Sequence, residues 1–210
     1  MRFYTTLQLG QFHPTFCEDF LYAEQLNEQY FVAAVFDGCS SGKDSHFAST
    51  LMAKSLKMIC KKLPYEQQWN PSFDFENVSA DELGALILRR LFEQCQKHKN
   101  QLLLERIELV ATCVLLVYNL KHKAAWINIS GDGLFAVNNA VRMIDQNDLP
   151  NYMAYHLDKD YEDWVDQESQ TFTYKQVENI AISTDGILSF AKNNTENVDS
   201  INASDYLLLD

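Results

Sequence analysis

Three short apolar runs in the sequence end at the same dipeptide, an aspartate followed by a glycine. The pairs are Asp37-Gly38, Asp132-Gly133 and Asp185-Gly186. The run before the first pair, YFVAAVF at residues 30–36, has the β-branched and aromatic composition of a strand that is buried on both faces. A glycine beside a carboxylate lets a ligand approach the backbone, so such a strand end is a typical place for chemistry. A single Asp-Gly pair is also common in turns, and it is the repetition that favours a shared site.

The three aspartates are expected to converge if their strands end at one sheet edge. Carboxylates that are held close together repel one another, which destabilises the folded state unless a cation lies between them. Hard oxygen ligands of this kind prefer Mg²⁺, Mn²⁺ or Ca²⁺. The repeated motif therefore predicts a metal site that contains Asp37, Asp132 and Asp185.

The net charge limits the partners of the chain. A charge of −12 over 210 residues argues against nucleic acid, whose phosphates need Lys and Arg, and against anionic membrane surfaces. Bound divalent cations would reverse the local charge and admit a dianionic phosphate group. The five cysteines, with no CxxC pair, indicate free thiols in a reducing compartment. Without a signal-peptide core or a run of transmembrane length, a cytoplasmic protein is expected.

Two other phosphate chemistries fail a test of spacing. No cysteine is followed six residues later by an arginine, which excludes a Cys-x5-Arg phosphatase loop. Residues 38–44 superficially suggest a P-loop, but the glycine spacing is one residue short and Asp44 replaces the required Ser or Thr. The sequence therefore indicates no protein nucleophile for phosphate.

Periodicity predicts one α+β domain over residues 1–210, with strand groups on both sides of a long helical pair. A capping box at Ser79 is expected to begin the second helix. The acid-rich stretch 158–168 lacks the spacing of an EF-hand and is interpreted as a solvated loop. The expected elements are helices at about 46–63 and 79–103, an antiparallel strand pair within 20–36, strands at 107–118 and 124–130, and a hairpin from 135 to 144 that turns at Asn138-Asn139.

These stretches together resemble the signature motifs of the metal-dependent PP2C-type Ser/Thr protein phosphatases. FVAAVFDG, ISGDG and ISTDG are similar to three of the motifs, and Cys17-Glu18-Asp19 resembles the Glu-Asp pair on the first strand of that family. The segment VATC at residues 110–113 stands where the family carries a Ser/Thr-Thr-Ala strand. The five motifs occur in the order of the family across nearly the whole chain.

The resemblance implies a fold and a function. The fold would be a four-layer α-β-β-α sandwich, in which helices flank two mainly antiparallel sheets. The function would be hydrolysis of phosphoserine and phosphothreonine in a protein substrate, by water that two Mn²⁺ or Mg²⁺ ions activate. A monomer that acts in signalling is expected.

The resemblance also implies roles for individual residues. Asp37 would bridge two ions, and the Gly38 carbonyl would complete one coordination shell. Asp185 would bind the second ion and, with Asp132, could support a third. Asp19 would hold the activated water without binding metal itself.

Three features depart from the family pattern. Pro14, with His13 beside it, stands where an arginine often grips the phosphate, and Cys39 stands where many members have a histidine. The chain is expected to stop short of the final helix and strand, either as a fragment or as a short form, unless Asp205 replaces the last metal-binding aspartate. The alternative function is therefore a catalytically weak pseudo-phosphatase that binds a phosphorylated partner. The survival of the three Asp-Gly aspartates favours the enzyme, because such carboxylates are costly to keep without a metal.

Overall fold

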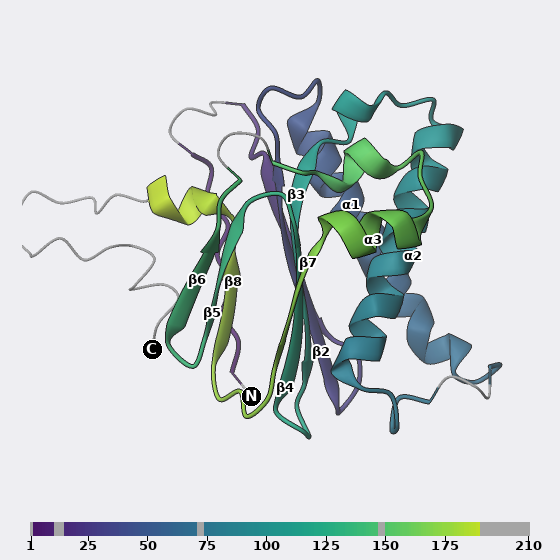
Figure 1. Cartoon of the computed structure of the whole chain (residues 1–210), viewed down its shortest axis with the longest axis vertical. Helices are drawn as coiled ribbons and strands as arrows, with labels where there is room; N and C mark the ends of the chain where they lie inside the picture. The colour runs from purple at the N-terminus through teal and green to yellow at the C-terminus, as the bar shows by residue number, and fades with distance from the viewer. Residues whose placement is uncertain (1, 11–14, 71–73, 147–149, 190–210) are drawn as a thin grey trace, which may run out of the picture.

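The computed structural model describes residues 2–10, 15–70, 74–146 and 150–189 as two antiparallel β-sheets packed face to face (Figure 1). The α-helices of these residues all cover the outer face of the larger sheet, and no α-helix among them covers the smaller one. The α+β class and the two antiparallel sheets expected from the sequence are confirmed. Hydrophobic cores fill both the space between helices and sheet and the space between the sheets.

The larger sheet has the order β1-β2-β3-β4-β7 and the smaller one the order β6-β5-β8, with every pairing antiparallel. The strands of the larger sheet are β1 (Asp19–Gln25), β2 (Tyr30–Gly38), β3 (Ala111–Asn119), β4 (Ala124–Ser130) and β7 (Gln170–Tyr174). Those of the smaller sheet are β5 (Gly133–Val137), β6 (Ala140–Ile144) and β8 (Ile180–Ser183). The predicted hairpin turns at Asn138 and Asn139, whose positive φ angles of 49° and 64° suit a tight turn between β5 and β6.

The two long helices run in opposite directions across the larger sheet (Figure 1). They are α1 (Ser45–Glu66) and α2 (Ala80–Gln101), close to the predicted ranges. The capping box is confirmed: Ser79 Oγ accepts a hydrogen bond from the backbone N–H of Glu82, and the Glu82 carboxylate accepts one from the backbone N–H of Ser79. No helix among the described residues is long and apolar enough to cross a membrane.

Strand β2 is packed on both faces, as its composition predicts. Side chains alternate along a strand, so Phe36 projects into the core beneath the helices, whereas Phe31 projects into the core between the sheets. Both side chains are buried. The strand that leads to Asp37 is therefore held in place by two separate cores.

The interpretation of residues 158–168 as a loop is wrong for most of that stretch. Residues Tyr161–Glu168 form a third helix, α3, on the same side as α1 and α2. Trp164 is fully buried and stacks on Phe92 of α2, with ring centroids 5.0 Å apart. Burial of this aromatic area outweighs the acidic composition of the segment. The strand expected from residue 107 also begins later, because Arg106–Glu108 forms a 3-10 turn before β3.

Gly84→Ala in α2 is expected to destabilise the protein, although alanine favours a helix by about 1 kcal/mol. A Cβ atom at Gly84 would lie 2.3 Å from ring atoms of Trp126, a buried side chain of β4, so the helix would have to move. We expect a loss of roughly 1–3 kcal/mol in the free energy of unfolding, measured by denaturant titration. The control is Ala85→Gly at the exposed neighbouring position, which reports helix propensity alone. A more stable Gly84→Ala variant would contradict the close helix–sheet contact.

Candidate functional site

Asp37 lies at the end of β2, opposite Asp19 at the start of β1. Opposed residues of an antiparallel pair project from the same face of the sheet, so the two carboxyl groups are neighbours. Because Phe36 faces the helices, Asp37 faces the smaller sheet. The register thus sets two like charges side by side, which destabilises a sheet unless another group offsets the repulsion.

Asp185 approaches the same point from the smaller sheet. It begins the 3-10 turn η3 (Asp185–Ser189) after β8, and its side chain is within hydrogen-bond reach of the Asp37 carboxyl group. The next residue is close as well, since a Cβ atom added to Gly186 would stand 3.7 Å from Asp19 Oδ2. Asp19, Asp37 and Asp185 therefore form one group, called here the carboxylate cluster.

The surroundings of Asp37 raise the pKa of its carboxyl group. Burial is the largest cause of its raised pKa, which reaches about 8, and the nearby Asp19 and Asp185 carboxylates shift it in the same direction. The charge of Glu18 adds to the effect. A hydrogen bond between two carboxyl groups needs a proton, so at neutral pH the pair can be neutralised by a proton or by a cation. The donors are hard oxygens, which Mg²⁺ and Mn²⁺ prefer.

Glu18 holds the loop that follows Asp37. Its carboxylate accepts hydrogen bonds from the hydroxyl groups of Ser40 and Ser45, both at 2.6 Å, and its backbone carbonyl accepts one from the N–H of Gly38 at 3.0 Å. A Cβ atom at Gly38 would lie 2.0 Å from the carbonyl oxygen of Ser45, so a larger residue has no room there. The glycine thus permits α1 to begin directly against the end of β2.

Cys39 occupies the position after the first Asp-Gly pair. Its Sγ lies 3.0 Å from Ser41 Oγ. Burial raises the pKa of the Cys39 thiol, but hydrogen bonds with Ser41, Tyr152 and nearby backbone N–H groups lower it more, so the net shift is downward. The side chain is half-buried beside the cluster.

Asp132, the aspartate of the remaining Asp-Gly pair, is hydrogen-bonded to the backbone. Its Oδ1 accepts a hydrogen bond from the backbone N–H of Gln146 at 2.9 Å, which ties it to the segment after β6. It follows Gly131, where a Cβ atom would lie 2.7 Å from Oγ1 of Thr112 on β3. Thr112 is in turn the β3 partner of Asp37. Asp132 therefore lies near the same strand ends as Asp37.

The described residues contain no group of three or more His, Cys, Asp or Glu side chains arranged to hold a metal ion together. The structure thus brings Asp19, Asp37 and Asp185 into one cluster but does not assemble three ligands around one point. His13, Pro14 and Asp205 lie outside the residues that the structure describes. The contacts of Glu18 with Ser40 and Ser45 were not predicted, because they join residues that are more than 20 positions apart in the chain.

A sequence model of the family described as Protein phosphatase 2C matches residues 13–204 of the chain. The match covers all five of the motifs identified above. No curated protein sequence matches the chain at a significant level.

Solved structures with the same fold include bacterial phosphatases. One is the serine/threonine phosphatase Stp1 from Staphylococcus aureus, with a TM-score of 0.56 and 14% identity, covering 96% of this chain and 85% of that one. Another is RsbX in complex with magnesium, with a TM-score of 0.52 and 19% identity, covering 86% and 72%. A third is the PP2C phosphatase domain of SpoIIE from Bacillus subtilis with a fragment of its regulatory domain, at a TM-score of 0.51 and 14% identity. The match covers 88% of this chain and 47% of that one, so this chain spans about half the length of that structure.

Asp37→Asn is expected to stabilise the metal-free protein at alkaline pH. The pKa of Asp37 is about 8 in the folded state and about 3.9 in an unfolded chain, so the folded state binds more protons between these values. The free energy of unfolding of the wild type therefore falls as the pH rises from about 4 through about 8. The variant does not lose this stability, because its amide group does not ionise. In EDTA, the free energy of unfolding of the variant should exceed that of the wild type by at least about 1 kcal/mol at pH 8, and by less at pH 5.

The matched control for this experiment is Asp163→Asn, on the exposed surface of α3. It removes the same charge without touching the cluster, so its effect on stability should be small and nearly independent of pH. A wild type that is more stable than Asp37→Asn at pH 8 in EDTA would contradict the repulsion described here.

Proposed function

The chain belongs to the protein phosphatase 2C family, and from this premise we propose that it is a metal-dependent phosphatase acting on phosphoserine and phosphothreonine in proteins. The observation that carries the proposal is the approach of Asp185 to Asp37, opposite Asp19, at the ends of strands from both sheets. Buried carboxylates so close together are the kind of group that divalent cations stabilise.

The proposed cofactor is Mn²⁺ or Mg²⁺. Asp37, Asp185 and the Gly38 carbonyl would hold two ions, and Asp132 is the proposed ligand of a third. The donor set fits such ions chemically, because all of these atoms are hard oxygens and because burial and neighbouring carboxylates raise the pKa of Asp37. When bound, the ions would neutralise the phosphate charge and activate water for hydrolysis. The fold that the chain shares with RsbX, whose structure contains magnesium, supports this assignment.

The other residues of the site are proposed to orient water and the loop after Asp37 rather than to bind metal. Asp19, next to Asp37 on the neighbouring strand, would accept a hydrogen bond from the attacking water and hold it in line with phosphorus. Glu18 fixes the loop after Asp37 through Ser40 and Ser45. Cys39 stands where many relatives place a histidine, and a thiol is a poor proton donor to a leaving alkoxide, so slow turnover is proposed.

The proposed substrate is a phosphorylated protein, and the chain is proposed to act as a monomer in signalling within the cytoplasm. A reducing compartment is supported by the five cysteines, all of which are free thiols in the structure. The net charge of −12 argues against nucleic acid as the partner.

A second function is favoured by one observation, that no three metal-binding side chains are grouped among the described residues. A pseudo-phosphatase would keep the fold and the cluster but bind a phosphorylated partner without hydrolysing it. The two functions differ in whether phosphate is released when metal is supplied.

Hydrolysis of p-nitrophenyl phosphate and of a phosphothreonine peptide should be weak and should require Mn²⁺ in the millimolar range or above. Asp37→Ala should reduce it to the background, because Asp37 is the residue proposed to contact both ions. Asp19→Asn should retain metal binding but lose about 10–100-fold in rate, as expected for a residue that orients a ligand from outside the metal shell. The measurement is a metal titration of the steady-state rate, with metal binding followed by calorimetry.

The control variant is Asp81→Ala, an exposed aspartate in the first turn of α2, which should leave the rate unchanged. Activity that persists in EDTA, or in Asp37→Ala, would exclude the metal-dependent mechanism. Tight binding of the phosphothreonine peptide with Mn²⁺ but no release of phosphate would identify the pseudo-phosphatase instead.

A further inference from the structure

Two large aromatic side chains are exposed near the carboxyl end of α1. Trp69, just beyond the helix, is 84% exposed, and Tyr65, one turn earlier, is 67% exposed. The other two tryptophans of the sequence, Trp126 and Trp164, are buried in the core. Exposed Trp and Tyr side chains are costly to leave in water and are the residues that most often anchor a protein interface.

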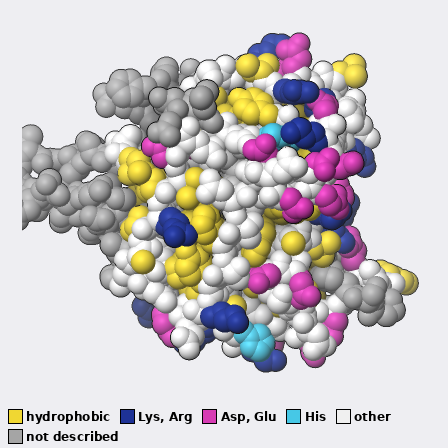
Figure 2. All heavy atoms as spheres, in the orientation of Figure 1, with side chains coloured by type: hydrophobic (Ala, Val, Ile, Leu, Met, Phe, Trp, Pro, Cys, Tyr) yellow, Lys and Arg dark blue, Asp and Glu magenta, His cyan; other side chains and the backbone are white. Residues whose placement is uncertain are grey.

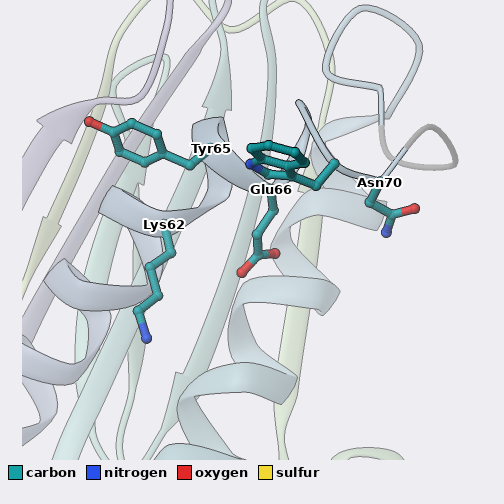
Figure 3. Close-up of a pocket in the computed structure, with 5 residues that line it drawn as sticks. Lys62, Tyr65, Glu66 and Asn70 are labelled. Carbon is teal, nitrogen blue, oxygen red and sulfur yellow. The ribbon is translucent and has the colours of Figure 1, made fainter.

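The aromatic side chains border a hollow in the surface. A cavity of about 400 Å³ is lined by Lys62, Tyr65, Glu66, Trp69 and Asn70. Figure 3 shows these residues at the end of α1. The Lys62 and Glu66 side chains project to the same side of the helix. Both also line a second cavity of about 280 Å³ between α1 and α2. The surface that the two neighbouring cavities line together is called here the α1–α2 groove.

The described lining of the α1–α2 groove has a small excess of positive charge in an acidic protein. Its charged side chains are Lys62, Arg90 and Lys97 against Glu66 and Glu93. The whole chain, in contrast, has a net charge of −12.

The ion pair within the groove leaves Lys62 and Lys97 as its two unpaired cations among the described residues. Glu66 is paired with Arg90 at 2.6 Å, so the one acidic side chain of α1 is already neutralised. Among the described residues, Lys62 and Lys97 have no carboxylate within 4.0 Å. On the face in Figure 2, acidic side chains over the helical side lie next to Lys and Arg side chains. Glu162 of α3, for example, pairs with Arg89 of α2.

We propose that the α1–α2 groove binds an acidic segment of a protein partner, with an apolar side chain of that segment packed against Tyr65 and Trp69. Two arguments favour this occupant. Lys62 and Lys97 complement carboxylates, which supplies specificity, while the aromatic side chains supply apolar contact area.

Two other occupants fit less well. An anionic bilayer is flat and would face a protein whose total charge is −12. A second copy in a twofold dimer would place the same basic patch on both sides of the interface, so Lys62 and Lys97 would face one another. Like charges in that arrangement repel.

The groove lies far from the carboxylate cluster. Helix α1 has 22 residues, which corresponds to about 33 Å. Its first residue, Ser45, contacts Glu18 beside the cluster, whereas Trp69 follows its last turn. The proposal therefore goes beyond the proposed phosphatase function, and binding at the groove can be measured without any turnover.

The test uses a fluorescein-labelled helical peptide rich in glutamate, with leucines on one face, and measures binding by fluorescence anisotropy. We expect saturable binding in the micromolar range, weaker with higher salt and weaker for the same peptide with glutamine in place of glutamate. Tryptophan emission of an unlabelled complex should shift to the blue, because Trp69 leaves water while Trp126 and Trp164 are already buried.

Matched pairs of variants distinguish binding at the α1–α2 groove from the general effects of changing the net charge or removing an exposed aromatic side chain. Lys62→Glu and Lys121→Glu change the net charge equally, and both lysines are exposed, but only Lys62→Glu should weaken binding, by about tenfold or more. Trp69→Ala and Tyr4→Ala each remove an aromatic side chain that is 84% exposed, and only Trp69→Ala should weaken binding to that extent. Equal melting temperatures and unchanged hydrolysis of p-nitrophenyl phosphate would show that the folds are intact.

Several results would overturn the proposal. One is a lack of peptide binding up to about 1 mM. Another is an equal loss of binding in the Lys62→Glu and Lys121→Glu variants. A third is Lys62-dependent binding to phosphatidylserine vesicles by a protein that does not bind the peptide. Concentration-dependent dimerisation that Lys62→Glu abolishes would assign the groove to a second copy and would also overturn it. A chain without phosphatase activity that still binds the peptide through Lys62 and Trp69 would leave this proposal supported and the proposed function refuted.

Discussion

The rest of the fold has to offset the electrostatic repulsion among the side chains of the carboxylate cluster. The β1–β2 register sets Asp19 against Asp37, and the end of β8 adds Asp185. The strand end cannot relax, because Phe36 anchors β2 to the helices and Phe31 anchors it to the other core. Burial of such side chains contributes roughly 1.5–3 kcal/mol each. Strong packing next to a repulsive group is how a protein keeps a binding site organised before its ligand arrives.

Helix α1 depends on the same strand end. Glu18 links the first turn of α1 to the loop after Asp37, because its carboxylate accepts hydrogen bonds from the hydroxyl groups of Ser45 in the helix and Ser40 in the loop. The absence of a side chain at Gly38 allows the helix to approach the strand end. A shift of the helix would therefore disturb the hydrogen bonds that hold this loop. The opposite end of the same helix carries the exposed Trp69. One rigid element thus extends from the carboxylate cluster to the α1–α2 groove.

Features with strong local signals could be predicted from the sequence, and features that depend on distant contacts could not. The periodicity of α1 and α2, the capping box at Ser79 and the doubly buried β2 all follow from neighbouring residues, and each is present. Helix α3 was missed because its acidic composition hid the aromatic residue, Trp164, that buries it against α2. The Asp-Gly repeats predicted that strand ends would converge, and Asp37 and Asp185 do lie together in the structure. The bond between Asp132 and the Gln146 backbone was not predictable, because side-chain direction at a strand end is set by a segment that follows later in the chain.

The carboxylate cluster also constrains the two functions that remain in competition. Burial, Asp19, Asp185 and Glu18 all raise the pKa of Asp37, so the site disfavours negative charge even before phosphate enters. One shared proton removes a single charge, whereas a phosphate group brings in up to two more. A phosphorylated ligand that bound at this cluster would therefore need a cation, whether or not it were hydrolysed. Metal dependence would then be common to the proposed enzyme and to the proposed pseudo-phosphatase. The role proposed for Asp19, which is to hold a water in line with phosphorus, would separate the two functions, whereas Asp37 would serve both.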